Sequence, residues 1–207
     1  MATPLEYLWD RARRLFRRKD TAREVPKPVV RQAIDDFGEA AKAELNRLAI
    51  RLQVGEINES EFAIKAKASI KSIHIAAASV ALGGKDKLTP KDLGYIGSLI
   101  KSEYKYFDAM MREVGAESQP LDGTFLARVA MYGAASTKTF EAVTRRANQV
   151  SGDFDQDRRR LGKAEHCPEC IEYAGKGWQP IGTLPEIGSK CSCKSNCKCY
   201  FEYRRSG

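Results

Sequence analysis

The sequence predicts a mainly α-helical protein. We expect an antiparallel helical body, a basic N-terminal helix, and a small cysteine-rich, zinc-ribbon-like C-terminal module with a short β-hairpin. Apolar residues recur at helical spacing, with no strand-like alternation before residue 178. All six cysteines lie at or after position 167. Four segments follow from this: a basic amphipathic arm and linker (1–28), a helical domain (29–150), a polar charged join (151–164) and a metal-binding cysteine-rich module (165–207).

The first segment is predicted to be an amphipathic helix, because Leu5, Leu8 and Leu15 recur at helical spacing. Prolines then interrupt the pattern, so residues 20–28 are expected to form a linker. We expect residues 4–19 to dock on an acidic groove or on DNA phosphates. Binding to a membrane surface is disfavoured because the apolar face is short. The predicted partner- or nucleic-acid-binding residues are the arginines on the polar face: Arg11, Arg13, Arg14, Arg17 and Arg18.

Four longer helical stretches are expected in the body, with apolar faces spanning residues 37–52, 62–81, 93–111 and 125–143. Gly83-Gly84 is a strong stop signal after the second stretch, and Thr89-Pro90 opens the third as cap and first-turn proline. Asp122 opens the fourth. Because the loops are short, neighbouring helices should be roughly antiparallel. His74 is expected to be a buried structural histidine, since no acidic or thiol side chain lies three or four residues away.

The formal net charge of +8 is concentrated at the two ends of the chain. Residues 1–31 have nine Lys/Arg against four Asp/Glu, and residues 156–207 have ten against six. Basic ends indicate either a polyanionic partner (nucleic acid or an acidic protein face) or a solvated, solubilising surface. The arginine run at 158–160, in the join, is expected to be an exposed charge run.

The sequence lacks the roughly 18-residue apolar run that crosses a bilayer. Its N-terminus also lacks the basic-then-apolar order of a secretion signal. We therefore expect a protein made in a reducing cytoplasm and not bound to a membrane. In such a compartment, clustered cysteines favour metal binding over disulfides.

The cysteines form a CxxC pair, Cys167 and Cys170, and two CxC pairs between residues 191 and 199. The intervening stretch is rich in glycine and proline and cannot form a long helix, so a tetrathiolate metal site would supply the missing organisation. Zinc is the default ion for this spacing. Six thiols exceed the four that are needed, so two are spare or form a disulfide, and His166 ranks below the cysteines as a ligand. The candidate metal ligands are Cys167, Cys170, Cys193, Cys197 and Cys199.

Three other interpretations of the cysteines remain open. Disulfides become more plausible if the mature protein leaves the cell in a released particle. A redox enzyme normally has its CxxC at the start of a helix in a strand-rich domain, and no such pattern is expected around Cys167. A zinc deaminase needs His-x-Glu upstream of Pro-Cys-x-x-Cys, whereas the order here is Cys-Pro-Glu-Cys.

Residues 178–181 and 200–205 are expected to pair as a hairpin on the metal site.

The C-terminal region resembles the tail of phage minor head proteins, which are related to the head-morphogenesis protein of phage Mu. The resemblance rests on residues 166–170, 177–182, 184–185, 187–188 and 193–199, which end in Asn-Cys-Lys-Cys. It implies a virion component near the portal vertex or inner capsid wall, with Cys167, Cys170, Cys197 and Cys199 as structural ligands. The chain departs from the pattern because it lacks a histidine before the last cysteine pair and carries the extra Cys191.

These observations predict a structural phage virion protein rather than an enzyme. It would be made in the host cytoplasm and incorporated into the virion, in several copies within a symmetric assembly. It would dock on the portal or major capsid protein, with packaged DNA as a further contact, and assist head assembly, DNA packaging or head–tail joining. Structural zinc is the expected cofactor. The alternatives are a nucleic-acid-binding zinc-ribbon regulator and a thiol-based enzyme.

Overall fold

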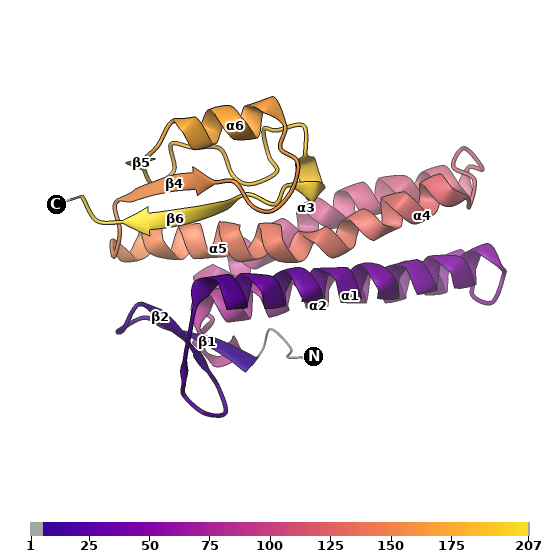
Figure 1. Ribbon diagram of the computed structural model, residues 1–207. Helices are drawn as coiled ribbons and strands as arrows, with labels where there is room; N and C mark the ends of the chain where they lie inside the picture. Colours follow the sequence, from indigo (N-terminus) through magenta and orange to yellow (C-terminus); the bar gives the residue numbers. More distant parts are fainter. Residues whose placement is uncertain (1–5, 207) are drawn as a thin grey trace.

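The computed structural model describes residues 6–206 and confirms the predicted fold class: a mainly helical protein with small antiparallel sheets and a cysteine-rich C-terminal cluster (Figure 1). The α-helices are α1 (Lys27–Gln53), α2 (Glu59–Leu82), α3 (Pro90–Gly115), α4 (Gly123–Ala130), α5 (Ala135–Ser151) and α6 (Pro168–Gly175). Three short 3-10 helices in the described residues lie between these helices or after α6: η2 (Lys85–Lys87), η3 (Met131–Ala134) and η4 (Lys194–Asn196). Within residues 6–206, no helix has the length and apolarity required to cross a bilayer.

The predicted helix boundaries of the body are marked by side-chain caps. Asn58 begins α2 by accepting a hydrogen bond from the backbone N–H three residues on, at 2.9 Å. Thr89 and Asp92 form a reciprocal capping box at the start of α3, and the Asp122 carboxylate caps α4. Gly83 ends α2 in the left-handed conformation, with φ of 89°. Gly83, Thr89 and Asp122 were predicted from the sequence, whereas the Asn58 cap was not.

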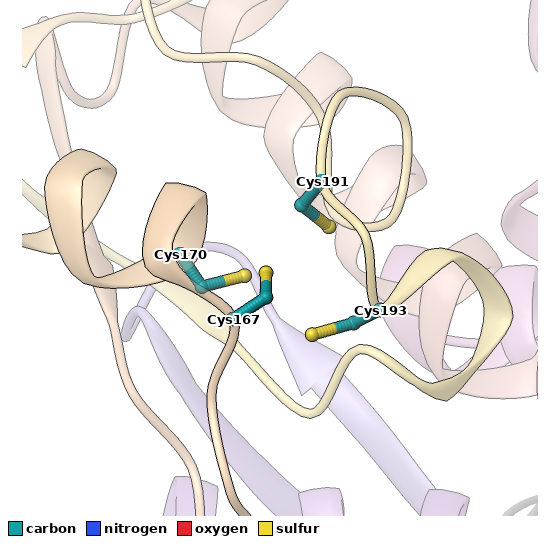
Figure 2. Close-up of side chains that lie close together, drawn as sticks. All are labelled: Cys167, Cys170, Cys191 and Cys193. Atoms are coloured by element: carbon teal, nitrogen blue, oxygen red, sulfur yellow. The ribbon is translucent and has the colours of Figure 1, made fainter.

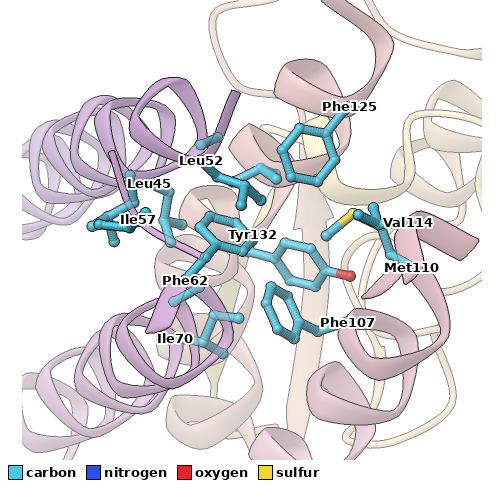
Figure 3. Packing of buried hydrophobic residues seen from close by; sticks show 14 of the residues in the cluster. Leu45, Leu52, Ile57, Phe62, Ile70, Phe107, Met110, Val114, Phe125 and Tyr132 are labelled. Carbon is cyan, nitrogen blue, oxygen red and sulfur yellow. The ribbon is translucent and has the colours of Figure 1, made fainter. Parts of the chain in front are cut away.

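Aromatic side chains fill the centre of the helical body (Figure 3). The ring of Phe62 lies 6.0 Å from that of Phe107 and 5.7 Å from that of Phe125, and Phe107 meets Tyr132 edge-on at 5.6 Å. Each fully buried side chain of this size stabilises the fold by about 1.5–3 kcal/mol. The predicted stripes therefore supply most of the core, but Leu93, at the start of the third stripe, is 51% exposed.

The predicted fourth helix is interrupted where it crosses α1. A 3-10 turn, η3, separates α4 from α5. At this point a Cβ on Gly133 would lie 2.6 Å from the backbone nitrogen of Lys42, a separation that real Cβ atoms do not reach. Glycine thus allows α1 and η3 to approach each other closely. The sequence pattern alone gave no sign of this break.

The prediction of a basic N-terminal helix is wrong for the residues that the structure describes, whereas Pro4 and Leu5 lie outside them. The segment forms an antiparallel sheet of β1 (Tyr7–Asp10), β2 (Leu15–Arg18) and β3 (Glu24–Val25). Tyr7, Phe16 and Val25 are buried against the ends of the body helices, and the ring of Trp9 lies 4.9 Å from that of Phe16. These aromatic residues favour strands. Their burial outweighs the weak helical spacing of the leucines.

A second sheet organises the C-terminal region. Its order is β5 (Gln179–Pro180), β4 (Gln156–Arg160), β6 (Tyr200–Arg204), with all pairs antiparallel. The segment expected to be a polar, mobile join therefore contains the central strand β4. The expected hairpin is also wrong in its pairing, because β5 and β6 each pair with β4 rather than with one another.

Buried charges attach this sheet to the helical body, and in Figure 1 the β4 and β6 strands lie between α5 and α6. Arg31 Nε of α1 lies 3.0 Å from the Glu141 carboxylate of α5, which in turn accepts the backbone N–H of Phe201 at 3.0 Å. Arg145 Nε of α5 lies 2.6 Å from Asp157 Oδ2 of β4. These hydrogen bonds and ion pairs connect the helices α1 and α5 to the strands β4 and β6.

Candidate metal centre

All six cysteines gather at one place, between the start of α6 and the loop that precedes β6. The sulfurs of Cys167, Cys170, Cys191 and Cys193 lie within 4.8 Å of one another, and Figure 2 shows these side chains pointing toward a common centre. Cys170 also belongs to a second group with Cys197 and Cys199, under the same 4.8 Å limit. The prediction that thiols from two distant stretches converge is therefore supported by the geometry, which adds Cys191 to the predicted set.

The CxxC pair is positioned by the first turn of α6. Cys167 is the N-cap residue, Pro168 occupies the first turn, and the N–H of Cys170 donates to the Cys167 carbonyl at 3.0 Å. This turn places both sulfurs on one side of the chain. We expected no redox-enzyme pattern around Cys167; the CxxC does open a helix, α6, but the protein is mainly helical rather than strand-rich. The redox interpretation gains little from it, since the pair lies among four further thiols.

Tight turns position the second group of cysteines. The backbone N–H of Lys194 donates to the backbone carbonyl of Cys191 at 3.2 Å, and the N–H of Asn196 donates to the carbonyl of Cys193 at 2.9 Å. These bonds form the 3-10 helix η4 and the turn before it. Gly188 has φ of 74° and lies against the backbone carbonyl of Lys194, so a side chain would not fit there. The loop therefore turns back on itself and directs its sulfurs toward α6.

The sulfur geometry suits a tetrahedral metal ion. Cys170 Sγ lies 3.6 Å from Cys197 Sγ. Metal–sulfur bonds of about 2.3 Å place two sulfurs of one tetrahedral ion about 3.8 Å apart. All six cysteines are free thiols, so the structure contains none of the disulfides considered as an alternative. The two groups of thiols could hold a metal ion.

Burial and hydrogen bonding divide the charge unevenly over the sulfurs. Cys170 and Cys199 are fully buried, whereas Cys167 and Cys193 are half-buried. Burial raises the pKa of the Cys170 thiol. The hydrogen bond with Cys199 lowers the pKa of Cys197 to about 4. The cluster thus stabilises at least one thiolate, the protonation state that binds metal.

A buried arginine faces this cluster from β4. Arg159 is 1% exposed, and its Nη1 lies 3.9 Å from Cys170 Sγ. Its Nη2 donates to the Pro185 carbonyl, and its guanidinium packs over the ring of Tyr173 at 5.0 Å. In the described part of the chain, no carboxylate forms an ion pair with Arg159. We expected this residue in an exposed charge run. Strand alternation, which buries Asp157 and Arg159 together, is the signal that sequence inspection missed.

His166 lies beside the second sulfur group. Its Nδ1 is 3.8 Å from Cys199 Sγ, and its Nε2 is 2.8 Å from the carbonyl oxygen of Gly162. His74, by contrast, lies in the helical body, 2% exposed, with its Nδ1 2.7 Å from Thr139 Oγ1. Its predicted structural role agrees with this burial.

The predicted partner-binding arginines lie on the N-terminal sheet and its turn, and none is among the residues grouped with the thiols. Arg11, Arg17 and Arg18 line a surface cavity of about 990 Å³ that extends to α2, α3 and α5. Arg14 packs over the Phe154 ring at 5.3 Å, and Arg13 lies in the exposed turn. Four further basic residues line the same cavity: Lys19, Lys87, Lys91 and Arg146. Sequence inspection missed these because three come from elements distant in sequence.

No family model, curated protein or solved structure matches this chain. The arrangement of its own residues is therefore what defines the class: a helical protein whose C-terminal module gathers six thiols in groups that could hold a metal ion.

Proposed function

We propose that the protein is a structural, non-enzymatic component of a phage virion, a minor head protein whose C-terminal module is clasped by zinc. The observation that carries this proposal is the composition of the module's core. Its buried residues are four cysteines (Cys170, Cys191, Cys197 and Cys199) with Leu184, Ile187 and Phe201. Three apolar side chains cannot order a loop-rich segment of this length. Metal coordination supplies the missing stability, as it does in small zinc-dependent domains.

The donor set favours zinc over other common ions. Six thiolate sulfurs in a small cluster select soft or borderline metals, and zinc is the usual occupant of tetrahedral thiolate sites in a reducing cytoplasm. A site closed by protein ligands has no open position for substrate or water. The resemblance of the cysteine-rich tail to phage minor head proteins agrees with such a scaffolding role.

The basic cavity is the proposed docking surface for the portal or major capsid protein. Its lining combines the basic side chains with apolar ones such as Leu8, Trp9 and Val150. Arg11 and Arg17 are held by Asp153 and Asp10, at 3.3 and 3.0 Å. A concave, partly apolar surface whose arginines already bind carboxylates fits an acidic, amphipathic protein segment better than a continuous row of phosphates.

Particles released by cells that carry this coding sequence provide the test. Mass spectrometry of purified particles is expected to find the chain in a fixed copy number relative to the portal protein. Its absence from particles, with the protein present in the producing cells, would overturn the proposed role.

Variants of the cavity test the docking surface. The double variant Arg11→Glu with Lys91→Glu is expected to lower recovery of the chain with the portal ring by about tenfold, since it reverses two charges of the cavity. Arg47→Glu is the matched control, because Arg47 is an exposed arginine of α1 outside the cavity. Equal recovery of both variants would contradict the assignment. A regulator that binds DNA would instead show affinity that falls steeply with salt.

A further inference from the structure

The six sulfurs provide more ligands than one ion can use, and their grouping shows how they divide. Cys167, Cys170, Cys191 and Cys193 supply the four sulfurs that one tetrahedral ion needs. Cys197 and Cys199 are left over, yet they are 4% and 0% exposed and lie around the same Cys170 sulfur. With a single ion, two buried thiols would stand beside a metal-bound thiolate without a role.

We propose that the module holds two metal ions, with the Cys170 thiolate bridging them and His166 Nδ1 completing the second site. This inference rests on the proposed zinc clasp and specifies its composition. The first ion takes the four sulfurs of Cys167, Cys170, Cys191 and Cys193. The second takes Cys170, Cys197, Cys199 and His166, so all six cysteines and the neighbouring histidine are used.

The position and orientation of His166 support its assignment. Its Nδ1 lies 3.8 Å from Cys199 Sγ, close to the roughly 3.6 Å that separates nitrogen and sulfur ligands of one tetrahedral zinc. His166 lies outside the group of Cys170, Cys197 and Cys199 whose sulfurs are all within 4.8 Å of one another, so its side chain would have to move closer to the other sulfurs when the second ion binds. Its Nε2 lies 2.8 Å from the Gly162 carbonyl, which only accepts hydrogen bonds. The proton therefore resides on Nε2 and the Nδ1 lone pair faces the sulfurs. A backbone carbonyl that fixes the tautomer in this way is typical of metal-bound histidine.

Charge balance is compatible with the second ion. Ionising the buried Cys197 and Cys199 adds two negative charges, and the second divalent ion adds two positive charges, so the net charge of the cluster does not change. The shared sulfur is the best placed to bridge, because Cys170 is fully buried at the centre of both groups. The buried Arg159 guanidinium, 3.9 Å from Cys170 Sγ, offsets part of the remaining negative charge.

Native mass spectrometry of the full chain, purified with zinc and reductant, tests the proposal. We expect about two zinc ions per wild-type chain and about one in His166→Ala, with the His74→Gln control retaining two. One ion in the wild type would overturn the two-metal inference but leave the zinc clasp in place. No ion in the wild type would overturn both. Two ions in His166→Ala would overturn the histidine assignment.

Cobalt(II) substitution tests the bridge separately. Two cobalt ions joined by one thiolate are magnetically coupled, so the chain loaded with two equivalents is expected to give a weaker electron paramagnetic resonance signal per ion than the chain loaded with one. Signals that simply add would overturn the bridging role of Cys170.

Discussion

Replacing Asp157 by alanine is expected to lower the free energy of unfolding by about 3–5 kcal/mol, because it leaves the Arg145 guanidinium buried without its partner. The exposed side-chain fraction is 0% for Asp157 and 7% for Arg145, so both charged groups are shielded from bulk solvent. The pair joins α5 to β4 at a nitrogen–oxygen distance of 2.6 Å. The loss should therefore loosen the attachment of the cysteine-rich module to the helices.

The double variant separates the attraction within this pair from the cost of burying it. Burial raises the pKa of Asp157 even though Arg145 donates a hydrogen bond to it, so desolvation outweighs the attraction. The double variant Arg145→Met, Asp157→Leu should consequently lose less stability than Arg145→Met and Asp157→Leu lose in total as single variants. The difference should be about 2 kcal/mol or more.

Urea unfolding followed by circular dichroism, at constant zinc and reductant, measures these differences. Glu202→Ala is the control, because its ion pair with Arg158 is one-third exposed and should contribute less than about 1 kcal/mol. A loss of under 1 kcal/mol in Asp157→Ala, or strictly additive losses in the double variant, would refute the reasoning.

Two further predictions concern single positions. Burial, followed by the charge of Lys138, lowers the pKa of His74 from 6.5 to about 4. Between these two pKa values the folded state therefore binds fewer protons than the unfolded state. The stabilising effect is full above pH 6.5 and falls by about 3 kcal/mol as the pH drops toward 4. In urea titrations over this range the wild type should lose more stability than His74→Gln, and parallel curves would contradict this. Gly162→Ala would place a Cβ against the backbone carbonyl of Lys198, so thermal unfolding should show a loss of about 1–3 kcal/mol. Gly123→Ala, in open space, should show none, and equal effects of the two alanines would count against the close approach.

The helical body could be predicted because its signals are local. Thr89, Asp122 and Gly83 mark helix ends through contacts within a few residues, and the apolar stripes between them become the core. The N-terminal sheet could not be predicted in the same way. Leucine spacing suggested a helix, whereas the burial of Tyr7 and Phe16 against distant helices decides for strands.

The metal centre was partly predictable for a similar reason. The CxxC turn is local, and its convergence with the later cysteines follows from thiolate chemistry. The position of Cys191, the inward direction of Arg159 and the orientation of His166 depend on β4 and Gly162, which are brought to the site by tertiary packing. Of these three, only the inward direction of Arg159 has a signal in the sequence, which is the alternation of β4.

Hydrogen exchange of the full chain, in reductant with and without a zinc chelator, tests the central claim most directly. If metal–thiolate bonds hold the C-terminal module together, chelation should strip amide protection from residues 165–205 while α1, α2 and α3 keep theirs. Unchanged protection of residues 165–205, in protein shown to be free of metal, would contradict the account.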